Sequence, residues 1–323
     1  MREADVCVIF NAVAGRGRAR QRIESLRRSL GARALFMPTR AQGHAEELAC
    51  EAATNGFAIV GAAGGDGTVH EVANGLLRAA RPEVALAVFP VGSANDYAHS
   101  LDLAPGWWLR GDPTAHTRTV DVGQVRTNDG RARYFVNGAG IGFNGAVTLE
   151  SQRIRRLQGV WLYSLALFRA FCRRFTAPVM TIEMDGCEQR LPTLALSVAI
   201  GRREGNFVLA PHAVVDDGLF DYLHVGQLRR WELFRYFPGM LTGDLPTDHP
   251  AIRVGRCRHV RVQADTPLIV HLDGELFSRP EENRRDLDIR ILPATLAVQT
   301  CRPTESGRHG HESTLGRGCR GEE

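Results

Sequence analysis

The side chains best suited to phosphate chemistry lie in a glycine-rich segment, Gly64-Gly65-Asp66-Gly67-Thr68, which directly follows an apolar run. Glycine lets a backbone approach its ligand closely, so the N–H groups of such a loop can surround an anion at the start of a helix. Asp66 would repel phosphate on its own, and its place in the loop indicates a Mg²⁺ ion between the two. The simpler alternative is a tight turn between a strand and a helix, with Thr68 as an ordinary cap.

Two more loops of this type follow apolar runs. One spans residues 90–98 and contains Ser93, Asn95 and Asp96, and the other spans residues 11–17. If the apolar runs are parallel strands, all three loops lie at the carboxyl ends of the strands, where ligands bind. We therefore expect a nucleotide site there, although Asp96 taken alone would also suit an Asx-type helix cap.

The 323 residues include no lysine, and the 40 basic residues, all of them Arg, exceed the 36 acidic residues by only four. Without a lysine amine, the chain can have neither a P-loop lysine nor Schiff-base chemistry at a lysine. Phosphate must therefore be bound by Arg, backbone N–H groups, hydroxyls or a metal ion. A net charge of +4 is too small to predict nucleic-acid binding.

The seven cysteines are scattered and show no disulfide or zinc spacing, which is typical of reduced thiols in a cytosolic protein. The N-terminal residues are charged and then strand-like, unlike a signal peptide. The longest apolar run, residues 160–168, is too short to cross a bilayer. These observations predict a cytoplasmic protein without a membrane-spanning segment.

Two patterns divide the chain. Over the first hundred residues strand-like runs alternate with helical periodicity, which predicts βαβ units and a parallel sheet. From about residue 118 to residue 292, short β-type runs are separated by turn signals, as in an antiparallel sandwich. The polar residues from 302 onward are predicted to be disordered. The expected N-terminal strands are 5–10, 33–37, 57–63 and 84–91, and the expected helices are 15–30, 42–55 and 68–80.

One long helix, residues 151–175, is expected to interrupt the β-rich half. Its apolar stripe includes the aromatic residues Trp161 and Phe168, and Arg residues gather toward both of its ends. A basic amphipathic helix with aromatic residues suits an anionic membrane surface. The alternative is an ordinary amphipathic helix packed on its own domain, where the stripe could also line a lipid channel.

Seven ordered motifs resemble those of the diacylglycerol kinase catalytic family, which includes bacterial lipid kinases and the sphingosine and ceramide kinases. Each motif alone is weakly specific, whereas the set in family order is highly specific and covers residues 11–275. The motifs are Asn11–Gly15, Thr39-x-x-x-Gly43-His44-Ala45, Gly64–Thr68, Pro90–Ala98, Asn137–Gly145, Asp216–Asp221 and His271–Glu275.

The resemblance implies an α/β N-terminal nucleotide domain, like that of NAD kinases and diacylglycerol kinases, and a β-sandwich-like C-terminal domain. The active site would lie in the cleft between them. The implied ATP-binding domain comprises residues 1–118 and about 292–302, the lipid-substrate domain residues 119–291, and the disordered tail residues 303–323. The expected reaction is ATP-dependent transfer of the γ-phosphate to a hydroxyl of a lipid, such as a diacylglycerol or a sphingoid base. The acceptor, the nucleotide preference and the oligomeric state, a homodimer included, stay open.

The resemblance also assigns roles to individual residues. Asp66 and Asp96 would hold the Mg²⁺ of the nucleotide through water, and Glu275 would be the general base that accepts the proton of the lipid hydroxyl. Taken alone, Glu275 would be read as a solvated residue after a β-turn. The expected ATP site consists of Asn11, Thr39, Gly64, Gly65, Asp66, Gly67, Thr68, Ser93 and Asn95.

A second, structural Mg²⁺ is implied at the side chain of Asp217, together with the backbone carbonyls of Val214 and Leu219. The alternative for this segment is a type I turn. Three residues, Ala12, His70 and Asn144, depart from the family pattern. The departure at Asn144 bears on the identity of the acceptor.

Two rival functions stay open. A soluble NAD kinase would share the glycine-rich loop, but it does not explain residues 90–98 or 273–275. A catalytically silent module that binds nucleotide or lipid would explain the departures, but not the retention of Asp66, Asp96 and Glu275. As a lipid kinase, the protein would be cytoplasmic and would contact the inner membrane surface peripherally.

Overall fold

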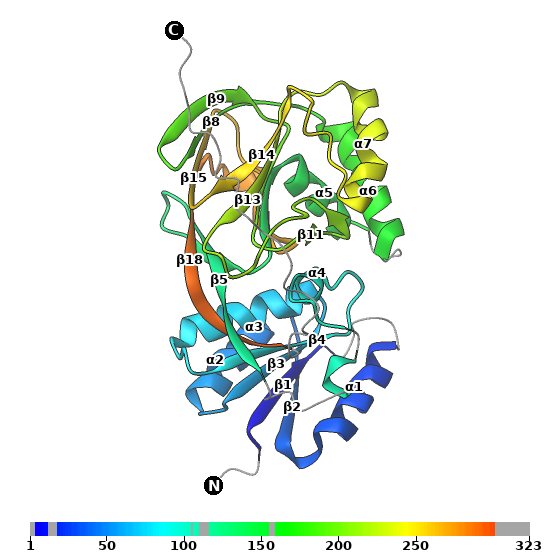
Figure 1. The fold of residues 1–323 in the computed structure, drawn as a ribbon, viewed down its shortest axis with the longest axis vertical. Helices are drawn as coiled ribbons and strands as arrows, with labels where there is room; N and C mark the ends of the chain where they lie inside the picture. The colour runs from blue at the N-terminus through cyan, green and yellow to red at the C-terminus, as the bar shows by residue number, and fades with distance from the viewer. Residues whose placement is uncertain (1–3, 12–17, 105, 110–115, 155–158, 301–323) are drawn as a thin grey trace, which may run out of the picture.

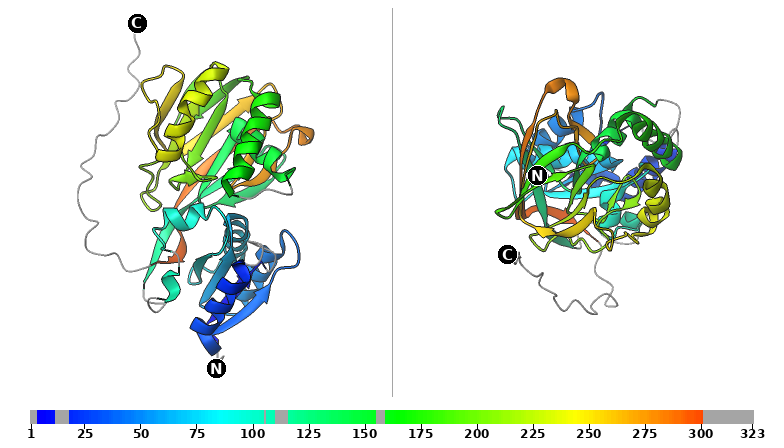
Figure 2. Two further views of the ribbon diagram at one scale, coloured as in Figure 1. Left: turned by 90° about the vertical axis from the view of Figure 1, so that its right-hand side faces the viewer. Right: turned by 90° about the horizontal axis from the view of Figure 1, so that it is seen from above.

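The computed structural model describes residues 4–300, apart from 12–17, 105, 110–115 and 155–158, and it consists of two lobes (Figure 1). The first lobe holds the N-terminal strands and helices α1 to α4, and the second holds the later helices and most antiparallel strands. The lobes are stacked along the long axis of the molecule, as the side view in Figure 2 shows. The predicted disordered tail and Ala12 lie outside the described residues.

The first lobe is built on a parallel arrangement of strands in the order β2-β1-β3-β4. Strands β1, β3 and β4 are buried throughout, which explains why the sequence shows them as continuous apolar runs. The predicted alternation of strands and helices is confirmed, with residues 15–17 of the first predicted helix outside the described part. The elements are β1 (Val6–Phe10), α1 (Arg18–Leu30), β2 (Ala34–Pro38), α2 (His44–Thr54), β3 (Ile59–Gly64), α3 (Asp66–Ala79), β4 (Ala85–Pro90) and α4 (Asp96–Ser100).

The second lobe is a sandwich of antiparallel strands, as predicted. The rings of Phe135 and Phe220, one from each layer, stack in the core with centroids 5.7 Å apart. One layer has the order β14-β13-β10-β7-β16-β17, and a short hairpin, β11–β12, extends toward α4 of the first lobe. The strands of that layer and the hairpin are β7 (Gly138–Gly142), β10 (Ala195–Ala199), β11 (Arg203–Glu204), β12 (Phe207–Val208), β13 (Phe220–Val225), β14 (Ile252–Cys257), β16 (Val270–Leu272) and β17 (Glu275–Ser278).

The other layer continues into the sheet of the first lobe through one long strand, β18 (Asp286–Gln299). Strand β18 pairs with β5 along most of its length, and near its end Val298 pairs in parallel with Leu86 of β4. The last described strand therefore returns to the first lobe, and Figure 1 shows it in orange alongside β5. The further strands of this layer are β5 (Thr117–Arg126), β6 (Ala132–Phe135), β8 (Val179–Met184), β9 (Cys187–Pro192) and β15 (His259–Ala264).

The single long helix predicted for residues 151–175 is wrong. The structure has two helices, α5 (Phe143–Gln152) and α6 (Gly159–Arg174), and a third, α7 (Arg230–Thr242), that the sequence pattern did not indicate. Helix α5 begins directly after Gly142, whose φ of 79° only glycine adopts easily. Because glycines are rare in helices, those that precede α5 gave no indication that a helix begins here. Helix α7 contains Pro238, which normally argues against a helix. Among the described residues, no helix has the length and apolar character needed to span a membrane.

The buried side chain of His224 gives the second lobe a defined pH response. Its Nε2 lies 3.1 Å from Thr193 Oγ1, and burial lowers its pKa to about 4. The unfolded chain takes up a proton near pH 6.5 while the folded protein does not. Stability is therefore lost as the pH falls from about 6.5 to about 4, by about 3 kcal/mol for this group. Urea unfolding across this range should show a shallower decline for His224→Gln than for the unsubstituted protein, and equal slopes would contradict the assignment.

Candidate active site

The glycine loops after β3 and β4 lie directly against each other. The N–H groups of Val91 and Gly92 donate hydrogen bonds to the carbonyl of Gly64, at 3.1 and 3.0 Å. A Cβ atom on Gly92 would collide with the backbone of Gly65, so this close approach of two backbones requires glycine. The predicted convergence of these two loops at one edge of the sheet is confirmed.

The other predicted ATP-site residues lie at the same edge. Asn11 follows β1 and donates its N–H to Ala63 of β3 at 3.3 Å, and Thr39 follows β2 and donates its N–H to Phe10 of β1 at 2.9 Å. The side chain of Thr68 lies over Gly64, where even a methyl group would collide with it. The structure thus brings the predicted residues of four strand ends together around one surface.

Asn95 has a mainly structural role in its loop. Its φ of 54° is in the left-handed region, its Oδ1 accepts the N–H of Gly92 at 3.0 Å, and its Nδ2 donates to the Gly92 carbonyl at 3.1 Å. These bonds close the loop on itself and leave Ser93, which is exposed, at its tip. Ser93 is therefore free to meet a ligand, whereas Asn95 shapes the loop that carries it.

Asp66 begins α3, and its carboxyl group points toward α4. Its Oδ1 accepts the N–H of Tyr97 at 3.2 Å, and none of the ion pairs among the described residues involves it. Burial raises the pKa of Asp66 to about 7, and the nearby carboxylates of Asp96 and Asp273 contribute to this shift. The negative charges of these neighbours disfavour the ionised form of Asp66. A divalent cation bound beside it would offset this repulsion.

The described residues do not form a cage for a metal ion, because no group of three or more His, Cys, Asp or Glu side chains is arranged to hold one. This fits Mg²⁺, which proteins commonly bind through one or two carboxylates while substrate phosphates and water complete its shell. The Asp66 carboxyl, which lies near that of Asp96, would supply one such ligand to a nucleotide-bound Mg²⁺.

Asp96 joins the two lobes. Its buried carboxylate accepts the N–H of Gly205 at 2.6 Å and that of Asn206 at 3.2 Å, and Arg203 Nε lies 3.6 Å away. Burial raises the pKa of Asp96, while the charge of Arg203 and the two N–H groups act in the opposite direction. The carboxylate thus holds the turn of the β11–β12 hairpin against the start of α4.

Glu275 comes from the second lobe and contacts the glycine loop of the first. Its Oε2 accepts a hydrogen bond from Gln42 Nε2 at 2.9 Å, and a Cβ atom on Gly67 would lie 2.6 Å from its Oε1. Burial raises the pKa of Glu275, and the nearby charge of Glu71 adds to this effect. A carboxylate with a raised pKa is a better proton acceptor, which suits a general base.

The turn before Glu275 is fixed by Asp273, which the sequence analysis included in the motif His271–Glu275 without assigning it a role. Its carboxylate accepts the N–H groups of Val136, Asn137 and Gly138 at 2.8 to 3.0 Å and lies 2.8 Å from His70 Nδ1. Burial alone would raise the pKa of Asp273, but the hydrogen bonds and His70 hold it below its usual value. His70, one of the family departures, thus ties α3 to the turn that carries Glu275. Asp-Gly pairs are common in exposed turns, so the sequence did not indicate that Asp273 is buried.

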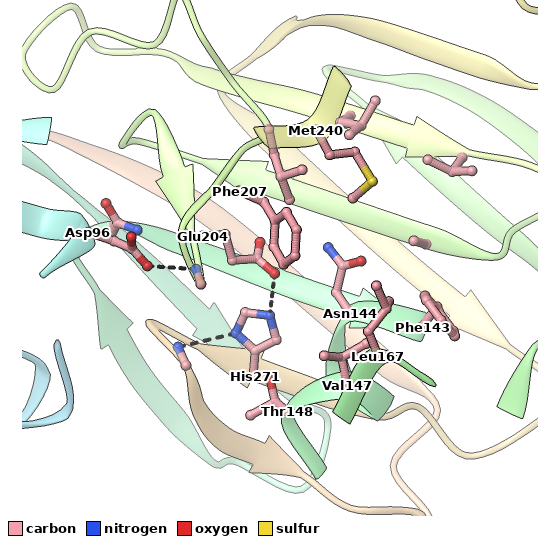
Figure 3. Close-up of a pocket in the computed structure, with 18 of the residues that line it drawn as sticks. Asp96, Phe143, Asn144, Val147, Thr148, Leu167, Glu204, Phe207, Met240 and His271 are labelled. Atoms are coloured by element: carbon pink, nitrogen blue, oxygen red, sulfur yellow. Dashed lines mark hydrogen bonds and ion pairs between the residues drawn. The ribbon is translucent and has the colours of Figure 1, made fainter. Parts of the chain in front are cut away.

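A large apolar cavity lies in the second lobe between α5, α6, α7 and the six-stranded sheet (Figure 3). It holds about 1370 Å³ of space that no atom fills, part of it open to solvent. Its polar end reaches Asp66 and Asp96, and Asn144 is also in its wall.

Glu275 lines a smaller neighbouring pocket of about 520 Å³, while Gly274 lines the large cavity. Sequence reasoning missed two polar residues of the cavity, Glu204 and His271, although the second belongs to one of the family motifs.

The environment of Asp217 differs from that of a metal ligand. One carboxylate oxygen is paired with the Arg256 guanidinium, and the other accepts the N–H of Leu219 at 3.1 Å. Val214, whose carbonyl was the expected second ligand, is exposed. The present donor set does not fit a divalent cation unless the ion displaces Arg256. A structural Mg²⁺ here remains a prediction, and no step of the proposed chemistry uses it.

Two domain profiles match this architecture. The profile of the diacylglycerol kinase catalytic domain matches residues 5–129, and that of the YegS C-terminal NAD kinase beta sandwich-like domain matches residues 138–300. A solved structure, "The crystal structure of a diacylglycerol kinases from Bacillus anthracis str. Sterne", is 22% identical in sequence. It superposes with a TM-score of 0.67 over 93% of this chain and 97% of that one, which establishes the shared fold.

Two curated relatives have sequence similarity over most of their length. A "Probable lipid kinase YegS-like" from Pseudomonas aeruginosa (strain UCBPP-PA14) is 34% identical over 267 residues, which cover 79% of this chain and 81% of the relative. A "Diacylglycerol kinase" from Bacillus subtilis (strain 168) is 31% identical over 243 residues, which cover 73% of this chain and 77% of the relative. The chain belongs to the diacylglycerol kinase catalytic-domain family, a family of lipid kinases.

Proposed function

We propose that this protein is an ATP-dependent lipid kinase that transfers the γ-phosphate of ATP to a hydroxyl group of a lipid. One observation carries the proposal, namely that the apolar cavity ends at Asp66, beside the glycine loops. A cavity of this kind accommodates an acyl or alkyl chain, and it would bring the hydroxyl at the end of that chain to the phosphate-binding surface. The same walls do not suit the polar ribose and nicotinamide groups of NAD.

The chain supplies its phosphate-binding groups without lysine. The N–H groups of the loop at Gly64–Thr68, with the hydroxyls of Thr68 and Ser93, would bind the phosphate oxygens at the start of α3. Asp66 and Asp96 would hold a Mg²⁺ ion through water. When bound, that ion would neutralise the charge that develops on the β- and γ-phosphate oxygens.

In the proposed step the lipid hydroxyl oxygen forms a bond to the γ-phosphorus, and the bond from that phosphorus to the β–γ bridging oxygen breaks. The hydroxyl proton passes to the carboxylate of Glu275, and ADP leaves. Glu275 contacts Gly67, the residue next to Asp66, so the proton acceptor and the phosphate-binding loop lie side by side. The hydrogen bond from Gln42 orients that carboxylate.

Peripheral contact with a membrane is the second part of the proposal. Trp161 and Phe168 on α6 and Trp231 on α7 are exposed by 77%, 57% and 54%, and the same helices contribute Leu167 and Tyr236 to the cavity. Trp side chains favour the interface between lipid and water. Docking of this face would place the cavity next to lipid chains.

Only part of the Arg cluster of α6 is available for anionic lipid. Arg173, like Arg153 at the end of α5, pairs with the fully buried Glu150, at 3.2 and 2.8 Å. The Arg residues therefore serve the packing of α5 on α6 as well as the surface charge. We expect the exposed aromatic side chains to contribute more than the Arg residues to vesicle binding.

The test of the proposed function is transfer of label from γ-labelled ATP to a panel of lipids with free hydroxyls, with the products identified by mass. The expected result is a phosphorylated lipid and stoichiometric ADP. Phosphorylation of NAD instead would support the soluble rival, and binding of ATP without any turnover would support a silent module. Either of these outcomes would overturn the proposal.

A further inference from the structure

Glu204 and His271 form a polar pair in the wall of the apolar cavity. Glu204 lies on β11, and its Oε1 is 2.8 Å from Nε2 of His271 on β16. Its Oε2 accepts a hydrogen bond from Ser197 on β10 at 2.9 Å. Figure 3 shows the pair between Asp96 on one side and Asn144 and Phe143 on the other. The pair therefore lies where the acidic end of the cavity meets its apolar part.

The geometry around His271 determines which of its nitrogens carries the proton. The N–H of Gly274 points to Nδ1 at 3.3 Å, so Nδ1 accepts and Nε2–H donates to Glu204. The ring lies against Gly140, where any side chain would collide with it, and it is 1% exposed. Burial would raise the pKa of Glu204, but His271 and Ser197 keep it below its usual value, so the side chain is a carboxylate.

Glu204 differs from the other carboxylates at this end of the cavity in its remaining capacity to accept hydrogen bonds. Asp273 is saturated by three backbone N–H groups and His70, and Asp96 is held by two backbone N–H groups and Arg203. Among the described residues, Glu204 has two hydrogen-bond partners, Ser197 and His271, although a carboxylate offers about four acceptor positions.

A charged acceptor with free positions in an apolar cavity needs a donor from whatever fills that cavity. A buried polar group without a partner is costly, and hydrogen bonds to charged groups are stronger than those between neutral groups. Glu204 is 21% exposed and lines the cavity, so a molecule in the cavity can reach it. Its neighbours on the cavity side are apolar or amide groups such as Phe207 and Asn144.

We propose that Glu204 determines the acceptor, by accepting a hydrogen bond from a second donor group that lies beside the hydroxyl receiving the phosphate. This inference rests on the proposed lipid kinase activity. The second donor is a hydroxyl or an ammonium group, as in a monoacylglycerol or a long-chain amino alcohol. A diacylglycerol carries only esters next to its hydroxyl, and it would leave the free positions of Glu204 unpaired.

The experiment compares three acceptors of equal chain length, namely a 1-monoacylglycerol, a long-chain 2-amino-1-alcohol and a 1,2-diacylglycerol. Values of kcat/KM are measured with γ-labelled ATP for the unsubstituted protein, Glu204→Gln and Glu204→Asp. The control is Glu188→Gln, which removes an exposed carboxylate on β9. Thermal unfolding of each variant reports whether it is folded.

We expect the unsubstituted protein to prefer the two acceptors with a second donor. Glu204→Gln should lower kcat/KM for them by about 10- to 100-fold, as a lost hydrogen bond to a charged group implies, and change it for the diacylglycerol by less than about threefold. The decrease in kcat/KM should be larger for the amino alcohol, because its ammonium group also loses the attraction of the negatively charged Glu204 carboxylate. Glu204→Asp keeps the charge and should restore part of the amino-alcohol activity, and Glu188→Gln should change nothing.

An equal loss for all three acceptors would overturn the inference, because it would mean that Glu204 only supports the fold of the site. Preference for the diacylglycerol by the unsubstituted protein, or unchanged selectivity in both Glu204 variants, would overturn it as well. If the unsubstituted protein phosphorylates none of the three lipids nor any other lipid alcohol, the proposed function has failed instead, and the two failures are thus distinct.

Discussion

Replacement of Glu275 by Gln is expected to lower the rate of phosphoryl transfer by about a thousandfold, as the loss of a general base does, while ATP binding stays unchanged. Gln has nearly the same shape, so it preserves the contact with Gly67 and an oxygen for the hydrogen bond from Gln42. It removes only the ability to take the proton from the lipid hydroxyl.

The measurement combines kcat with labelled ATP and a saturating lipid with the Kd of ATP obtained by calorimetry. Glu281→Gln, which changes an exposed carboxylate on the same stretch of chain, serves as the control and should behave like the unsubstituted protein. Near-normal turnover by Glu275→Gln would refute the assignment of the base. A large loss of ATP binding would show that the residue acts on the nucleotide instead.

Asp66→Asn should likewise lower transfer by about a thousandfold, but through loss of the Mg²⁺-dependent part of nucleotide binding. The amide oxygen can still accept the N–H of Tyr97, so the loop keeps its shape. Titration of ATP with Mg²⁺ and with a chelator should show a large difference for the unsubstituted protein and a small one for Asp66→Asn. A normal response to Mg²⁺ in the variant would contradict the proposed role.

The same substitution should stabilise the protein when nucleotide and metal are absent. The pKa of Asp66 is about 7 in the folded protein and near 3.8 in an unfolded chain, so the folded state holds a proton that the unfolded state releases between these values. Stability therefore falls as the pH rises from about 4 to about 7, and the cost is full above pH 7. Asp66→Asn removes this cost, and unfolding at pH 8 should show a gain of about 4 kcal/mol, with little gain near pH 4. A loss of activity combined with a gain of stability distinguishes a strained functional residue from one that supports the fold.

The first lobe could be predicted well because its signals are local. Each buried parallel strand is a continuous apolar run, and each glycine loop follows its strand directly. Parallel strands bring their carboxyl ends together whatever lies between them in the sequence, so the positions of Asp66 and Asp96 relative to each other followed from topology alone. The arrival of Glu275 from the other lobe was available only through the family resemblance.

The parts of the site that could not be predicted depend on contacts between segments far apart in the sequence. Asp273 has the local pattern of an exposed turn residue, yet three N–H groups from residues 136–138 bury and saturate it. Glu204 lies on a two-residue strand without periodicity, so no pattern placed its side chain in the cavity. Helix α5 contains no basic residue, whereas the residues that follow it are apolar and basic like those of α6, and this composition favours one continuous helix.

The long strand β18 has a consequence for any attempt to divide this protein. The segment that matches the catalytic-domain profile ends at residue 129, but the strand that borders β4 and pairs with β5 begins at residue 286. A fragment cut at the profile boundary would expose the edge of β4 and leave β5 without its longest partner. Unpaired strand edges are templates for aggregation. To exchange lobes between relatives, one would therefore have to transfer β18 together with the N-terminal half of the chain. The sheet of the first lobe is completed by a strand from the C-terminal end of the sequence.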